Sequence, residues 1–175
     1  MGKARFTVLA AMVLAVVASR LIPHAPNFTP LAALALFSGA SFAGKRAAFL
    51  VPLCGLLLSD MVLGFYPISA VVYGSFALIT CLGFWLRRGT TVSRLAGTTL
   101  AGALLFFVLT NFGVWMLGAW YPRTVAGLGE CFVAAIPFLR NTVVSDLLYS
   151  ALLFGGLALL EKRWPRLAER VPAAA

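Results

Sequence analysis

The sequence predicts an all-α membrane protein, a single bundle of six transmembrane helices with both termini on the cytoplasmic side. Of the 175 residues, 62% are hydrophobic and only 11% are charged, and the mean hydropathy is +0.98. A soluble domain carries about 25% charged residues, so these charges are too few to cover a water-facing surface. The apolar residues form long runs rather than the alternating strands of about ten residues that a membrane β-barrel requires.

Six apolar segments account for most of the chain. The second segment is short for a spanning helix, which needs about 20 residues. The apolar stretch 131–139, ahead of the last segment, is expected to be an extra helical turn or a re-entrant piece. The first segment also fits a signal peptide, with a basic start and small residues near its end. No internal repeat or second domain is evident, so the whole chain is one domain with spans at about 6–22, 30–43, 47–65, 68–86, 95–117 and 142–160.

The basic residues orient these spans. Eleven of the 14 Lys and Arg fall on one side of a six-span arrangement, and only Arg20, Arg123 and Arg140 fall on the other. The positive-inside rule makes the first side cytoplasmic, which predicts a multi-pass protein of the bacterial inner membrane. This topology explains the net charge of +9, so we expect the partner of the basic clusters to be the lipid bilayer and no nucleic acid.

The residue inventory excludes several classes of site. Three cysteines at wide spacing give neither a disulfide framework nor a zinc pattern, and the single histidine, His24, excludes a bis-histidine haem site and an HExxH protease. No P-loop, GxGxxG or GxSxG motif is present. We therefore expect no bound nucleotide, no recognisable enzyme signature and no coupling of transport to ATP by this chain alone.

Polar side chains inside apolar segments are costly and need a partner or a function. Asp60, Asn111 and Asp146 lie near the outer ends of the third, fifth and sixth segments, with Trp115 and Tyr149 one helical turn from Asn111 and Asp146. Their common depth predicts a polar cup that opens to the outside. The alternative is that Asp60 and Asp146 form buried pairs with Arg20 and Arg140, and that the aromatic residues form an interfacial belt.

The outer loops add candidate ligand contacts to this cup. The first loop contains three prolines, which exclude a helix. The long loop before the last span carries further aromatic and polar residues. With Tyr73 of the fourth segment, the additional candidates are His24, Asn27, Phe28, Tyr121, Arg140 and Asn141.

Cysteines and small residues within the spans allow both ordinary and functional interpretations. Cys54 and Cys81 fit simple packing, although a thiolate is also a soft ligand for a transition metal. Small residues recur at Ala11, Ala15 and Ala18 and again at Ala32, Ala35 and Gly39. Such spacing permits close helix approach, either within the bundle or against another membrane subunit.

Several motifs resemble those of small membrane transport proteins. They are the first-loop run from Pro23 to Phe37, Ser59-Asp60, the run from Asn111 to Trp115, the run from Tyr121 to Leu128, and the stretch from Cys131 to Tyr149. Together with six helices and an outward cup, these motifs resemble the S components of energy-coupling-factor vitamin transporters, and most of all the BtuM-type cobalamin transporters.

The resemblance implies a carrier that binds cobalamin, vitamin B12, from the outer side and delivers it to the cytoplasm. It implies that the thiolate of Cys81, or in reserve that of Cys131, is an axial ligand of the cobalt. Removal of an axial group such as cyanide could accompany binding. An energy-coupling module could dock on the small-residue faces. Three alternatives stay open: a carrier of another vitamin or a nucleobase, a membrane enzyme using Asp60 and Asp146 as an acid–base pair, and a structural subunit of a larger complex.

Overall fold

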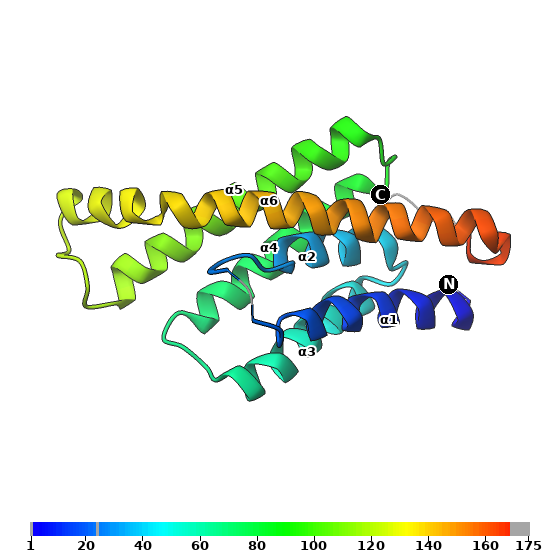
Figure 1. Cartoon of the computed structure of the whole chain (residues 1–175), viewed down its shortest axis with the longest axis horizontal. Helices are drawn as coiled ribbons and strands as arrows, with labels where there is room; N and C mark the ends of the chain where they lie inside the picture. The colour runs from blue at the N-terminus through cyan, green and yellow to red at the C-terminus, as the bar shows by residue number, and fades with distance from the viewer. Residues whose placement is uncertain (1, 24, 169–175) are drawn as a thin grey trace.

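The computed structural model describes residues 2–23 and 25–168, and these ranges form a helical bundle with no strand (Figure 1). Six α-helices follow one another, with a short 3-10 helix after the last. In chain order they are α1 (Lys3–Ser19), α2 (Leu31–Ser41), α3 (Lys45–Leu63), α4 (Ser69–Leu86), α5 (Val92–Leu117), α6 (Val125–Arg163) and the 3-10 helix η1 (Pro165–Leu167).

Four helices, α3 to α6, are long and apolar enough to cross a membrane. The exposed side chains in the described part of the chain include many large apolar ones, such as Leu58, Leu104 and Leu152. Contact of such side chains with lipid is favourable, whereas their contact with water is not. The expectation of six transmembrane helices is therefore only partly met. α1 has 17 residues, about 26 Å, and α2 has 11 residues, about 17 Å, against a hydrocarbon core of about 30 Å.

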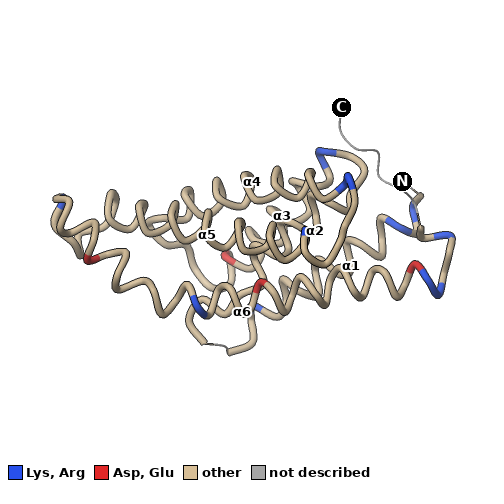
Figure 2. The backbone as a smooth tube through the Cα atoms, turned by 90° about the horizontal axis from the view of Figure 1, so that it is seen from above, with Lys and Arg blue, Asp and Glu red and all other residues tan. Residues whose placement is uncertain are grey.

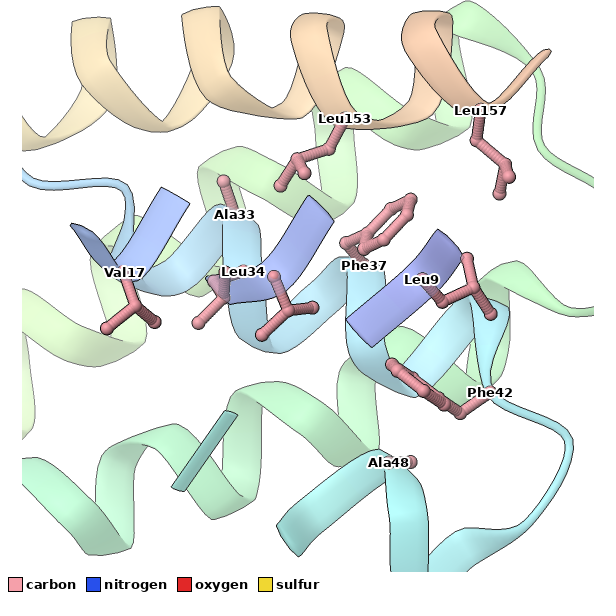
Figure 3. Packing of buried hydrophobic residues seen from close by; sticks show 10 residues of the cluster. Leu9, Val17, Ala33, Leu34, Phe37, Phe42, Ala48, Leu153 and Leu157 are labelled. Atoms are coloured by element: carbon pink, nitrogen blue, oxygen red, sulfur yellow. The ribbon is translucent and has the colours of Figure 1, made fainter. Parts of the chain in front are cut away.

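Helix α2 is the centre of the bundle and contacts each of the other five helices. It is apolar all round, as expected of a helix enclosed by others, and Leu34, Leu36 and Phe37 are fully or almost fully buried. Figure 3 shows Leu34 and Phe37 facing side chains from α1 and α6. The first apolar segment forms α1 and contributes Leu9 and Val13 to this core.

Two glycines bring α2 and α4 into backbone contact. A Cβ on Gly39 would lie 2.2 Å from the carbonyl oxygen of Thr80, and one on Gly83 would lie 2.5 Å from the carbonyl oxygen of Leu36. Neither position has room for a side chain. The small residues of the second apolar segment therefore serve packing inside the bundle, whereas Ala11, Ala15 and Ala18 of α1 are exposed on its surface.

Helix α6 is continuous over 39 residues, about 58 Å at about 1.5 Å per residue. The long loop expected before the last span is thus mostly helix, and the stretch 131–139 is neither re-entrant nor a separate turn. Arg140 and Asn141 lie within the helix, and Pro137 is inside it as well. The first part of α6 runs beside the second part of α5, and together they project beyond the other helices (Figure 1).

The basic residues gather at one end of the bundle, where α1 begins and α6 ends (Figure 2). We call this the basic end, and the opposite end, where α5 meets α6, the cavity end. The one-sided clustering seen in the sequence is therefore a clustering in space, although Arg170 lies outside the described residues. The basic end is defined by Lys3, Arg5, Lys45, Arg46, Arg87, Arg88, Arg94, Lys162, Arg163 and Arg166.

Candidate functional site: a cavity between α5 and α6

A cavity of about 410 Å³ lies toward the end where α5 meets α6, since Trp120 and Tyr121 of the α5–α6 connection line it. Its volume is within the range of small-molecule sites. Its wall combines apolar side chains with a few polar groups, which is the composition typical of such sites. Three regions far apart in sequence supply it: the first loop with the start of α2, the α3–α4 connection with the start of α4, and the facing parts of α5 and α6. The polar lining residues are Arg20, Asn27, Thr29, Tyr66, Thr110, Asn111, Trp120, Tyr121 and Cys131.

One face of each long helix forms the main wall. On α6, Cys131, Ala134, Ala135 and Phe138 line the cavity, and residues separated by three or four positions share a helix face. The two alanines leave room that larger residues would fill. On α5 the corresponding face carries Phe106, Thr110, Asn111 and Val114.

The side chains of Thr110 and Asn111 are partly committed to their own helix. The Thr110 hydroxyl donates to the carbonyl of Phe106 at 2.7 Å, and the Asn111 amide donates to that of Phe107 at 2.8 Å. The Thr110 hydroxyl oxygen and the Asn111 side-chain oxygen can still accept hydrogen bonds. This wall can thus accept hydrogen bonds from a solute.

A buried ion pair supports the cavity from the α1 side. Arg20 follows α1, and its Nη1 donates to Asp60 Oδ1 at 3.0 Å and also to the hydroxyl of Ser59. The hydroxyl of Tyr73 donates to Asp60 Oδ2 at 2.9 Å. Asp60 is completely buried, while Arg20 lines the cavity. The carboxylate therefore neutralises and orients the guanidinium, and the cavity gains a donor without a net charge.

Tyr66, in the connection between α3 and α4, also lines the cavity. Burial and then the negative charge of Asp60 raise the pKa of Tyr66 above its ordinary value of 10.0. Its phenol consequently stays protonated at physiological pH and can both donate and accept a hydrogen bond.

Asp146 is not part of the cavity wall but holds the start of α2. The helix begins at Leu31 after Pro30, which offers no side-chain cap, so its first amide groups need an acceptor from elsewhere. Asp146 of α6 is completely buried, and its Oδ1 accepts from the amide of Ala33 at 3.2 Å. A carboxylate also interacts favourably with the positive end of the helix dipole. Its Oδ2 has no partner within the described residues.

Further residues of α6 fix the first loop against the bundle. The hydroxyl of Ser145 donates to the carbonyl of Thr29 at 3.0 Å, and the amide of Asn141 donates to the carbonyl of Pro26 at 3.0 Å. Asn27 between them has a φ of 58°, a left-handed conformation that asparagine tolerates better than most residues. These contacts position Asn27 and Thr29 at the cavity.

Aromatic residues surround the opening. The indole of Trp115 donates to the carbonyl of Pro122 at 3.0 Å and so ties α5 to the α5–α6 connection. Trp120 and Tyr121 of that connection line the cavity, and Trp120 is 86% exposed. An exposed tryptophan at an opening can stack on a flat solute.

The cysteines occupy different surroundings. Cys131 is buried, lines the cavity and donates its thiol to the carbonyl of Asn111 at 3.5 Å. Cys81 is exposed on α4, nine positions after the cavity residue Val72. At about 3.6 residues per turn this places Cys81 on the opposite face of the helix and about 14 Å farther along it. The reserve candidate, not the preferred one, therefore lies at the cavity.

The structure brings only some of the predicted site residues together. Asn27, Asn111, Tyr121 and Cys131 line the cavity. Asp60, Tyr73, Trp115, Asn141 and Asp146 support it through the contacts above. Three further candidates do not line it: Tyr149 contacts Ser19 of α1 at 3.5 Å, Arg140 is exposed, and Phe28 is half-buried in the first loop. The predicted contact His24 lies outside the described residues.

The predicted pairings of the two aspartates have different outcomes. Asp60 forms the pair with Arg20, whereas Asp146 binds the start of α2 and not Arg140. The expected cup between α3, α5 and α6 is therefore displaced toward α5, α6 and the α3–α4 connection. Thr29, Tyr66 and Thr110 were not among the predicted residues. The spacing of Phe106, Thr110 and Val114 on one face of α5 was the available signal for this wall.

These features are those of a helical, multi-pass membrane protein with a cavity of about 410 Å³ toward one end. Comparison with known families is more specific: the model of a family of unknown function, DUF6580, matches residues 2–167. Because the match covers nearly the whole chain, the protein belongs to this family. No curated protein and no solved structure matches it significantly.

Proposed function

We propose that this protein is a carrier of the bacterial inner membrane that binds a vitamin-sized organic solute at the cavity end and delivers it to the cytoplasm. The observation that supports this most strongly is the cavity itself. Hydroxyl, amide, phenol and indole groups that line a space inside a bundle in lipid are costly without partners, and a polar molecule that enters the cavity would supply these partners. The basic end then faces the cytoplasm by the positive-inside rule.

The lining favours a solute that is neutral or nearly so. The charge of Arg20 is already balanced by Asp60 at 3.0 Å, and no other ionised side chain lines the cavity among the described residues. Tyr66, Thr110 and Asn111 offer hydrogen bonds, while Trp120 and Tyr121 offer flat apolar surfaces. A ring-containing vitamin or nucleobase with several polar substituents matches these groups.

Cobalamin is the first solute to test, because the sequence motifs resemble those of cobalamin transporters. The cavity of about 410 Å³ lies at the low end of small-molecule sites. A corrinoid would therefore lie across the opening with one axial face directed inward. In this proposal Cys131, and not Cys81, is the axial cobalt ligand. Its thiol would leave the Asn111 carbonyl and, as a thiolate, displace the axial ligand on the inward face of the cobalt. Where that ligand is cyanide, it leaves with the thiol proton as hydrogen cyanide.

Visible absorption of purified protein mixed with cyanocobalamin and hydroxocobalamin tests this assignment. We expect a spectral shift with the wild type that is lost in Cys131→Ser and retained in the matched controls Cys81→Ser and Cys54→Ser. Loss of the shift in Cys81→Ser alone would contradict the assignment to Cys131. Equilibrium dialysis against other vitamins and nucleobases, run in parallel, identifies the solute if no corrinoid binds.

The two remaining alternatives have different support. Asp60 and Asp146 have separate partners on different elements, so nothing favours their action as an acid–base pair. The exposed alanines of α1 do offer a face for an energy-coupling module. Uptake into liposomes by the purified chain alone, compared with uptake after co-expression with candidate membrane partners, tests whether such a module is required.

A further inference from the structure

A second cavity, of about 660 Å³, lies at the basic end, away from the proposed solute site. The start of α1, the end of α2, the α4–α5 connection and the last turns of α6 surround it. Three arginines and a single acidic residue line it: Arg5, Arg87, Arg88 and Glu161. The electrostatic potential in this cavity is therefore positive. Figure 2 shows the Lys and Arg residues gathered at this end of the bundle, as expected where a helical bundle meets the membrane surface.

Arg5 is the least expected of these groups because it is only 5% exposed. Its Nη1 donates to Glu161 Oε1 at 2.5 Å and to the carbonyl of Leu167. Its Nε, which is also buried, has no hydrogen-bond partner within the described residues. A buried guanidinium N–H is rarely left unsatisfied, and here it belongs to a residue that lines a cavity. This N–H has no access to solvent, so a ligand in the cavity would reach it through a small shift of the Arg5 side chain.

The α4–α5 connection adds two further sources of positive potential. Arg87 is fixed at the end of α2 by donating to the carbonyls of Gly39 at 2.8 Å and Phe42 at 2.5 Å, which holds its guanidinium at the cavity. α5 begins at Val92 with no acidic residue in its first turn, and the Thr91 hydroxyl accepts from the amide of Arg94 at 3.3 Å. The amides of Val92 and Ser93 are left for an anion, which the start of a helix attracts. Thr90, Thr91 and Val92 line the cavity at this point.

We propose that this cavity binds a phosphate group, carried either by an anionic lipid headgroup or by a soluble phosphate. Arginine suits phosphate because its planar fork donates two parallel hydrogen bonds. Arg88 and the unpaired N–H of Arg5 would bind the phosphate oxygens, with the start of α5 contributing its amides. Glu161 competes with the ligand for Arg5. This inference does not rest on the proposed transport function.

Native mass spectrometry of the full chain in mild detergent tests the proposal with two probes, phosphatidylglycerol and inorganic phosphate, and with phosphatidylcholine as the zwitterionic reference. We expect binding of at least one anionic probe in preference to the reference. Arg88→Gln should weaken it about tenfold, as loss of a hydrogen bond between charged groups does. The matched control, Arg166→Gln, removes the same charge from the same end outside the cavity and should leave binding close to that of the wild type.

A second variant tests the same cavity without changing an arginine. Glu161→Gln removes the competing carboxylate and should strengthen binding of the same probe. Preference for phosphatidylglycerol that inorganic phosphate does not displace identifies a lipid site, whereas binding of inorganic phosphate alone identifies a site for soluble phosphates. Equal loss in Arg88→Gln and Arg166→Gln, or no preference over phosphatidylcholine, would overturn the proposal.

Discussion

Replacing Asp146 tests whether an intramembrane carboxylate acts as a structural cap or as a ligand of the solute. Asp146 is completely buried and accepts the amide of Ala33 at 3.2 Å. Asp146→Ala leaves that amide unsatisfied in a dry environment, which costs about 1–3 kcal/mol, and removes a charge–dipole interaction of about 0.3–1 kcal/mol. Removing Oδ2, which is buried without a partner within the described residues, relieves a cost that offsets part of this loss. We therefore expect the free energy of unfolding to fall by about 2 kcal/mol.

Asp146→Asn is the matched control, because the asparagine side chain keeps an acceptor oxygen at the same position. It should cost less than about 1 kcal/mol, the charge–dipole part alone. Thermal unfolding in detergent measures both variants. At about 2–4 °C per kcal/mol for a chain of this size, Asp146→Ala should lower Tm by about 4–8 °C and Asp146→Asn by no more than about 4 °C. Equal and negligible shifts would refute the capping role, as would loss of solute binding in a fully stable Asp146→Asn.

Three further outcomes follow from the same structure. Gly39→Ala places a Cβ 2.2 Å from a carbonyl oxygen of α4 and should destabilise the bundle by about 1–3 kcal/mol or more, whereas Gly97→Ala, with open space around it, should be neutral or stabilising by thermal unfolding. Arg20→Met leaves its buried α3 partner uncompensated and should cost about 3–5 kcal/mol; an unchanged Tm would contradict the ion pair. Among single-cysteine variants treated with N-ethylmaleimide in mild detergent, the one retaining Cys131 should react more slowly than the one retaining Cys81, because the Cys131 thiol lies inside the cavity and Cys81 lies on the surface; the reverse order would contradict this placement of the two thiols.

The sequence was sufficient to predict the helical class, because an apolar composition and long apolar segments indicate that lipid surrounds the helices. The prediction was less accurate for helices that are surrounded by other helices and not by lipid. The second segment is short because α2 is enclosed by the other helices, and its length need not match the bilayer. α6 extends through a stretch expected to be a loop because Pro137 and the polar residues around Arg140 interrupt hydropathy without breaking the helix.

The candidate site was predicted in part for a similar reason. Depth along a helix can be counted in the sequence, so Asp60, Asn111 and Asp146 were expected at one level. The direction in which each side chain points depends on helix rotation, which an apolar chain hides because lipid-facing and core-facing residues look alike. Cys81 and Cys131 illustrate this: both lie within apolar helices, and only their rotation separates the surface from the cavity.

The most direct test of a solute site between α5 and α6 is to fill it. Ala134 and Ala151 are both exposed on α6, but only Ala134 lines the cavity. Equilibrium dialysis of Ala134→Trp, Ala151→Trp and the wild type against hydroxocobalamin and the panel of vitamins and nucleobases provides the measurement. A solute that binds the wild type and Ala151→Trp but not Ala134→Trp is the predicted result. Equal binding by all three proteins, or no binding by the wild type, would contradict a solute site in this cavity.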